Sequence, residues 1–67
     1  MEHRTAVNLG DKFEKVEAHG NALTVARLVE FPGLPPHAYL DDKWHQYREL
    51  LISVSALLDP TLYRRVQ

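Results

Sequence analysis

The segment from residue 44 to residue 58 carries two hydrophobic periods at once, and each period predicts a different fold. Large apolar residues recur every three or four positions through the whole segment, which is typical of an amphipathic helix. From Leu51 onward, apolar residues also alternate with two serines, which is typical of a half-buried strand. A helix would place Trp44 and Tyr47 in the core. A strand that begins after them would leave both rings in a loop.

Details of the second half of this segment favour the strand. Ile52 lies off the helical stripe, and the two serines that follow it are poor residues for a helix interior. The segment ends at Asp59-Pro60, where an aspartate would oppose the dipole of a preceding helix. We therefore predict a strand over residues 51–56. The alternative is an α+β fold with a C-terminal amphipathic helix over residues 43–58.

Four further stretches are predicted as short strands, and two of them also fit a helix. In the first stretch, Asp11 and Glu14 have the spacing of a capping box, which would begin a short helix. In the second, one strand face has Arg27 as an exception among the apolar residues Leu23, Val25, Val29 and Phe31. A helix capped by Asn21 is the alternative there. The third is too short for a helix, and the fourth follows Pro60 and can supply the last strand. The four stretches are residues 12–19, 22–31, 37–40 and 62–66.

Two other stretches show neither the hydrophobic period of a helix nor that of a strand. Residues 31–36 read Phe-Pro-Gly-Leu-Pro-Pro, and their three prolines remove three backbone donors and bias the preceding residues toward extended geometry. We expect this stretch to be a rigid connector. Residues 1–9 show no periodic pattern, so we expect a loose lead-in followed by one small domain over residues 10–67.

The order of these elements resembles that of an SH3-like small β-barrel. The stretches that carry the resemblance are Gly10-Asp11-Lys12-Phe13, residues 23–31 and residues 51–58. The resemblance implies an all-β fold of about five short strands. Within that group the layout is also similar to the small plasmid-borne dihydrofolate reductases, which work through a glutamine and a tyrosine on the strand corresponding to residues 51–54. Neither residue type stands there in this chain, so the resemblance does not imply that activity.

Length and composition indicate a small domain that gains little stability from its size. A chain of 67 residues buries only about 60% of the surface that it exposes when unfolded. It has no cysteine, which excludes disulfides, thiolate metal sites and thiol nucleophiles and suits a reducing cytosol. Small domains of this kind often gain burial by self-association, so a homodimer is one expectation.

Charge and hydropathy narrow the class of partner. The formal net charge is −1, and the basic residues near the N-terminus are interleaved with acidic ones. Duplex nucleic acid selects a basic face, so we do not favour it as the partner. No apolar run reaches the length of a membrane span and none resembles a signal peptide, so we expect a cytoplasmic protein without a membrane partner.

Residues able to carry catalysis or bind a metal are scattered. The four histidines lie at least eight positions apart, and a zinc site usually contains a closer pair. Ser53 and Ser55 lack the Gly-x-Ser-x-Gly elbow of a hydrolase, and they fit solvent-facing strand positions or a turn cap better. No glycine-rich phosphate loop is present. We therefore predict no catalytic residue, no metal site and no cofactor, and do not expect an enzyme.

Aromatic residues and an arginine cluster around the ambiguous segment. Tyr39, Trp44, Tyr47 and Arg48 fall within ten residues, and these types are enriched at interface hot spots. We therefore predict a non-catalytic interaction module that binds a protein partner, or itself, through an aromatic loop. The competing interpretation is that Trp44 closes one end of the core.

Two other functions remain as alternatives. A small barrel with a stacking aromatic residue beside basic groups would bind nucleic acid. Its contacts would be Lys43, Arg48, Arg64 and Arg65. The further alternative is an accessory subunit of an enzyme.

Overall fold

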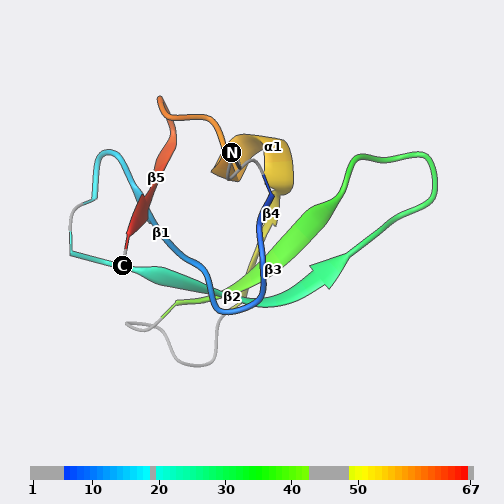
Figure 1. Cartoon of the computed structure of the whole chain (residues 1–67), viewed down its shortest axis with the longest axis horizontal. Helices are drawn as coiled ribbons and strands as arrows, with labels where there is room; N and C mark the ends of the chain where they lie inside the picture. The colour runs from blue at the N-terminus through cyan, green and yellow to red at the C-terminus, as the bar shows by residue number, and fades with distance from the viewer. Residues whose placement is uncertain (1–5, 19, 43–48, 67) are drawn as a thin grey trace, which may run out of the picture.

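The domain is all-β, and its described residues form five short strands and one short helix. The computed structural model describes residues 6–18, 20–42 and 49–66. The elements are β1 (Lys12–Lys15), β2 (Leu23–Val29), β3 (His37–Asp42), β4 (Glu49–Ser53), α1 (Val54–Leu57) and β5 (Tyr63–Val66). All neighbouring strands are antiparallel, in the order β4-β3-β2-β1-β5. Figure 1 shows α1 between the end of β4 and the start of β5. The all-β prediction is confirmed.

The core lies on the inner face of this sheet, where α1 packs against both outer strands, β4 and β5. Phe13, Leu40 and Leu57 come from β1, β3 and α1, and each is at most 1% exposed. The remaining buried apolar residues are Val7, Leu23, Val25 and Ala38. Because helix α1 contacts both outer strands, the sheet curls around a single small core, and one sheet face remains for solvent.

Strand β2 contains a β-bulge that changes which side chains face the core. The pairing with β3 shifts between Val25 and Arg27, so Val25 pairs with Leu40 and Arg27 pairs with Tyr39. Directly paired residues share a face, and an extra residue reverses the alternation. Leu23 and Val25 therefore point inward, whereas Arg27 and Val29 point outward. The expectation that Val29 shares a face with Val25 is wrong, and the bulge is the reason.

Strand β4 ends earlier than the serine alternation predicts. Ser53 has extended backbone angles, φ −67° and ψ 146°, and its Oγ accepts a hydrogen bond from the Ala56 amide at 3.1 Å. This is an N-cap, and the chain turns there into helix α1, which buries Leu57. The strand predicted over 51–56 is therefore correct only to Ser53. The alternative helix over 43–58 is also wrong where the chain is described, because 49–53 is a strand and the helix has four residues.

The connector and the turn before β5 are fixed by local hydrogen bonds. Gly33 has φ 75° and follows Pro32, and the Leu34 amide donates to the Phe31 carbonyl at 3.0 Å, which is the pattern of a type II turn. Near β5, Asp59 Oδ1 accepts from the Thr61 amide at 2.9 Å and from the Thr61 hydroxyl at 2.8 Å. These two bonds favour the ionised carboxylate and lower the pKa of Asp59.

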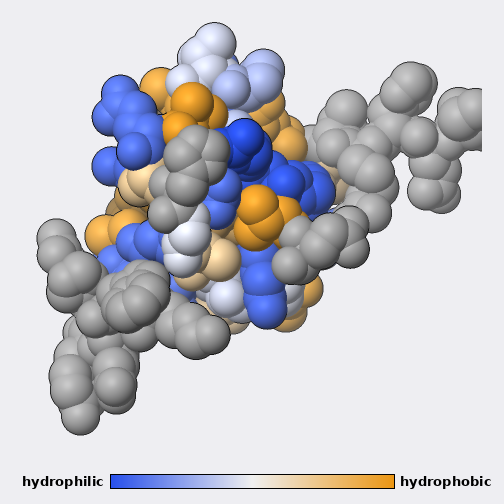
Figure 2. All heavy atoms as spheres, turned by 90° about the vertical axis from the view of Figure 1, so that its left-hand side faces the viewer, coloured by the Kyte–Doolittle hydropathy of each residue, from blue (hydrophilic) through white to orange (hydrophobic). Residues whose placement is uncertain are grey.

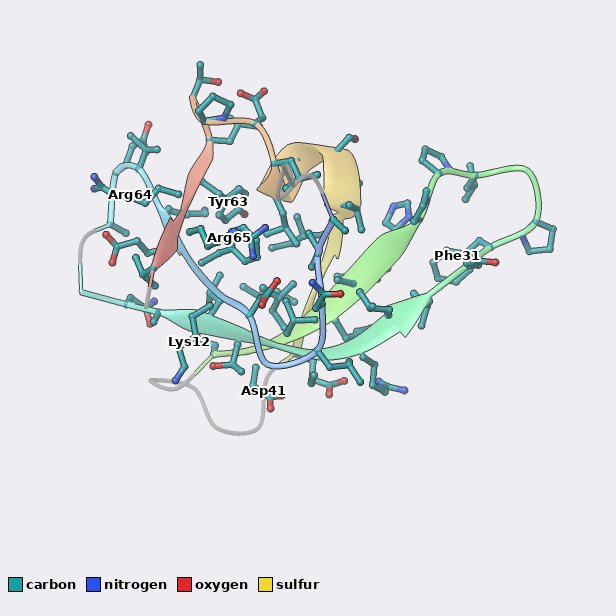
Figure 3. The ribbon with its side chains drawn as sticks, in the orientation of Figure 1. Lys12, Phe31, Asp41, Tyr63, Arg64 and Arg65 are labelled. Atoms are coloured by element: carbon teal, nitrogen blue, oxygen red, sulfur yellow. The ribbon has the colours of Figure 1, made fainter. Side chains whose placement is uncertain are left out.

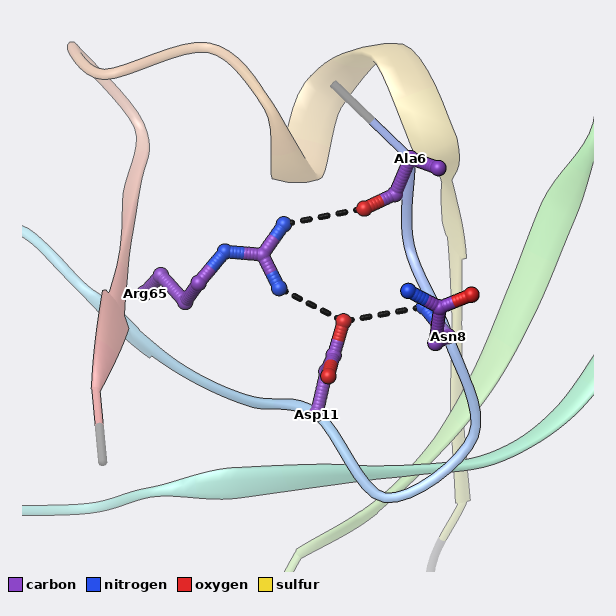
Figure 4. A network of polar contacts seen from close by, with 4 residues as sticks. All are labelled: Ala6, Asn8, Asp11 and Arg65. Atoms are coloured by element: carbon purple, nitrogen blue, oxygen red, sulfur yellow. Dashed lines mark hydrogen bonds and ion pairs between the residues drawn. The ribbon is translucent and has the colours of Figure 1, made fainter. Parts of the chain in front are cut away.

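The segment before β1 contacts the rest of the domain through Val7 and Arg65. Val7, within the predicted lead-in, is 6% exposed and belongs to the core. Arg65 on β5 donates one hydrogen bond to Asp11 Oδ2 and another to the Ala6 carbonyl, the second at 3.0 Å. The Asn8 amide donates to the same Asp11 oxygen at 2.9 Å (Figure 4). Residues 6–9 are therefore held by both a buried side chain and a polar network.

Candidate interaction surface

The outer face of β2, β3 and β4 carries the one sequence-predicted binding residue that the structure describes. Tyr39 lies in the middle of β3, and it pairs with Arg27 on β2 and with Leu51 on β4. The three side chains form one row across the sheet, on the face opposite the core. We call the row of Arg27, Tyr39 and Leu51 the Tyr39 row.

The Tyr39 ring is held in place by Arg27. The guanidinium carbon of Arg27 lies 4.4 Å from the centre of the Tyr39 ring, which is cation–π geometry. Arg27 Nη2 also donates to Glu49 Oε1 at 2.8 Å. The planar face of the Arg27 guanidinium therefore covers one side of the Tyr39 ring, and Glu49 neutralises the charge of the guanidinium. The result is an aromatic ring with a fixed orientation on a solvent-facing sheet surface.

Leu51 completes the Tyr39 row with exposed apolar surface. Its exposed fraction is 47%, although it lies in the middle of a strand with Tyr39 directly opposite. The tyrosine and the arginine of the Tyr39 row belong to the residue types enriched where proteins contact one another, and Leu51 adds apolar surface beside them. The apolar surface of the Tyr39 row is removed from water only when a binding partner covers it.

A second aromatic contact lies at the end of the β2–β3 hairpin. The rings of Phe31 and His37 meet edge to face, with their centres 5.5 Å apart. His37 Nδ1 donates to the Pro35 carbonyl at 2.8 Å, which fixes its ring. Figure 3 shows Phe31 at the side of the molecule away from β5. A hydrogen bond thus orients the His37 ring, and the Phe31 ring packs against it.

The other predicted binding residues, Trp44, Tyr47 and Arg48, lie outside the described residues. Asp41 pairs with Glu49, so the strands on either side of residues 43–48 are joined in register beside the Tyr39 row. Sequence reasoning missed Arg27, Glu49 and Leu51 as members of this surface. Arg27 did leave a signal, because it interrupts the apolar alternation of its strand. That interruption marks the bulge.

The two arginines at the C-terminal end are each held by a carboxylate. Arg64 Nε lies 3.2 Å from Glu14 Oε1, and Arg65 bonds to Asp11. Figure 3 shows Arg64 on the outer side of β5, whereas Arg65 points inward across the sheet. Arg65 also lies over the Phe13 ring at 4.8 Å. The two side chains therefore diverge and do not form a joint basic patch for nucleic acid.

Two hollows lie on the inner side of the sheet, away from the Tyr39 row. One of 340 Å³ opens between β4 and β5, and its apolar lining includes Ile52, Ala56 and Tyr63. The other, of 320 Å³, is bordered by Lys15 and the buried Asp42. Among the described residues, no three histidine, cysteine or acidic side chains are grouped to hold a metal ion.

Comparisons with known proteins provide no family assignment for this arrangement. No family model, no curated protein and no solved structure matches the chain. Within the described part of the chain, no helix has the length and apolar character needed to cross a membrane.

Proposed function

We propose that this chain is a non-catalytic interaction module, and that it binds a protein partner or another copy of itself through the outer face of β2, β3 and β4. The observation that carries the proposal is the Tyr39 row. It combines an aromatic ring fixed by Arg27 with a leucine that is 47% exposed in mid-strand.

The Tyr39 row suits binding because its order is established before any partner arrives. The Arg27–Glu49 pair and the stacking on Tyr39 restrict both long side chains. Side chains that are already ordered lose less conformational entropy on binding. Trp44, Tyr47 and Arg48 stay part of the prediction, because they lie in the sequence between two strands of this face.

The resemblance to SH3-like small barrels agrees with this proposal. The resemblance implies an all-β fold of about five short strands, and the described residues form five antiparallel strands. We infer that the chain is a small barrel of this kind. Loops and sheet faces of such scaffolds commonly carry recognition, which supports a binding role.

The test compares binding by variants of the Tyr39 row with a matched variant elsewhere. Tyr39→Ala and Leu51→Ala remove the row, whereas Leu34→Ala removes a leucine that is 59% exposed in the connector. Retention of a partner from cell extract and self-association in solution are both measured, and circular dichroism checks the fold. We expect the two row variants to lose binding and the Leu34 variant to keep it. Equal binding by all variants, or binding by none including the wild type, would overturn the proposal.

A further inference from the structure

Strand β4 is an outer strand of the sheet, and its free edge can be located residue by residue. The Val54 amide donates to the Pro36 carbonyl at 3.0 Å, and Ser53 pairs with His37 in the same register. Backbone bonding alternates along an antiparallel pair, so Leu50 and Ile52 bond to β3. The amide and carbonyl of Leu51 and the amide of Ser53 therefore point away from β3, whereas the Ser53 carbonyl, at the N-cap, accepts the first hydrogen bond of α1. In the part of the chain that the structure describes, no strand lies on that side of β4.

This edge lacks the features that usually prevent strands from pairing between molecules. Edge strands are commonly protected by lysines, prolines, bulges or inward-pointing charges. Strand β4 reads Glu-Leu-Leu-Ile-Ser, and its register with β3 is continuous. Its one charged residue, Glu49, is at the end and is paired with Arg27. The middle of β4 is therefore apolar on both sheet faces.

The opposite edge of the sheet is protected. Strand β5 carries Arg64 and Arg65, and two copies pairing through β5 would bring arginines together. Figure 2 shows the left-hand side of Figure 1, where β5 and the turn after β1 lie, and hydrophilic side chains there separate small hydrophobic patches. The two edges thus differ in charge and in apolar surface, and β4 is the one suited to pairing.

We propose that β4 pairs with β4 of a second copy of this chain, antiparallel and centred on Leu51, so that two sheets join into one. In this register Leu51 faces the second copy's Leu51, and Glu49 faces its Ser53, so no like charges meet. Glu49 and Leu51 carry both backbone groups on the free side of β4, and Ser53 carries its amide there. On the inner face, Leu50 of each copy meets Ile52 of the other, and both residues already pack against the core. The strand is therefore complementary to itself on its backbone and on both faces.

This inference rests on the proposed function, since it names a second copy as the partner and places that copy beside the Tyr39 row. An added strand would cover Leu51, and it would border the hollow that Ile52 lines. A twofold axis through Leu51 also closes the assembly at two chains, because each copy has one β4 edge to use.

Sedimentation velocity of the purified chain tests the pairing, with two Leu51 variants and one control. Leu51→Pro removes an amide that points to the free side and leaves the bonds to β3. Leu51→Lys places two like charges opposite each other. Leu34→Lys makes the same change at an exposed leucine in the connector. Circular dichroism checks that each variant folds, and if Leu51→Pro does not, Leu51→Lys carries the test.

We expect the wild type and Leu34→Lys to sediment as dimers, with twice the 7.7 kDa mass of one chain. The Leu51 variants should dissociate, with a dissociation constant raised about tenfold or more, which corresponds to at least about 1.4 kcal/mol. A wild type that stays monomeric up to about 1 mM, forms larger species, or dimerises equally well with Leu51→Lys would overturn the pairing. A monomeric wild type that still retains a protein through the Tyr39 row would leave the proposed function intact.

Discussion

Replacing Arg65 with methionine should destabilise the domain far more than the same change at its neighbour Arg64. The Arg65 side chain is 29% exposed, and it joins β5 to β1 and to the segment before β1. It donates to Asp11 and to the Ala6 carbonyl, and it lies over the Phe13 ring. Methionine keeps much of the side-chain length and removes all three contacts.

The size of the effect follows from these three contacts. Hydrogen bonds to charged groups contribute about 1.5–3 kcal/mol each when they are partly shielded from water. A cation–π contact adds about 0.5–1 kcal/mol. Asp11 keeps its bond from the Asn8 amide at 2.9 Å, so its carboxylate is not left without a donor. The bond to the Ala6 carbonyl is exposed, and contributions made by one side chain are not additive, so the total is smaller than the sum of these values. We expect a loss of about 2–3 kcal/mol in the free energy of unfolding, and a fall in melting temperature of roughly 10–20 °C for a domain of this size.

Urea denaturation followed by circular dichroism measures this loss directly. In the control Arg64→Met, the arginine is 45% exposed, and its partner Glu14 keeps a hydrogen bond from the Gly20 amide at 3.2 Å, so the expected loss is about 1 kcal/mol or less. Adding Asp11→Asn completes a double-mutant cycle with Arg65→Met, and we expect a coupling of about 1 kcal/mol or more. Equal losses from the two arginine variants, or strict additivity in the cycle, would refute the reasoning.

Three further predictions follow from α1 and the turn after it. Leu57→Ala empties a core position that is 1% exposed and should cost about 2–5 kcal/mol of unfolding free energy, measured in urea; a loss below about 1 kcal/mol would contradict the described core. Ser53→Ala removes the α1 cap and should cost about 1 kcal/mol, whereas Ser55→Ala should cost less, and equal losses would contradict the cap. Asp59→Ala should lower the melting temperature at neutral pH, because the folded carboxylate has a lowered pKa and its bonds from Thr61 stabilise the fold in the ionised form. The difference from wild type should be constant above about pH 5 and shrink as the pH falls below the ordinary value of 3.8 toward the lower folded pKa; thermal melts that show a constant difference would contradict this.

The strands were predictable from the sequence where one face alternates with the other without interruption. Phe13 and Leu40 each lie in a predicted strand and are buried, because period-two patterns report directly on a half-buried sheet. The bulge in β2 was not predictable in the same way. One extra residue near Ala26 reverses the alternation, and the sequence shows it only as a misplaced Arg27.

The end of β4 shows how a local side-chain bond can override a longer pattern. Ile52 and Val54 continue the alternation, yet the chain leaves the strand at Ser53 because the serine oxygen accepts an amide from the next turn. A serine in that pattern fits a solvent-facing strand position and an N-cap equally well. Burial of Leu57 in the core decides between these two roles of Ser53. The contacts of Leu57 are tertiary, so the local sequence does not show them.

The candidate surface was predictable only in part, because it is assembled across three strands. Tyr39 was found from its residue type. Leu51 and Arg27 join it through strand register, which a single sequence does not specify once a bulge intervenes. Trp44, Tyr47 and Arg48 lie outside the described residues and stay predictions.

Residue-resolved amide hydrogen exchange, measured at two protein concentrations, tests most directly whether two copies of the chain pair through the free edge of β4. The amides of Leu50 and Ile52 bond to β3 within one chain, so their protection should not depend on concentration. The amides of Leu51 and Ser53 face the free edge and should exchange quickly at about 10 μM and slowly at about 1 mM, because pairing follows mass action. Equal exchange of Leu51 and Ser53 at both concentrations, or protection that appears on β5 instead, would contradict the account.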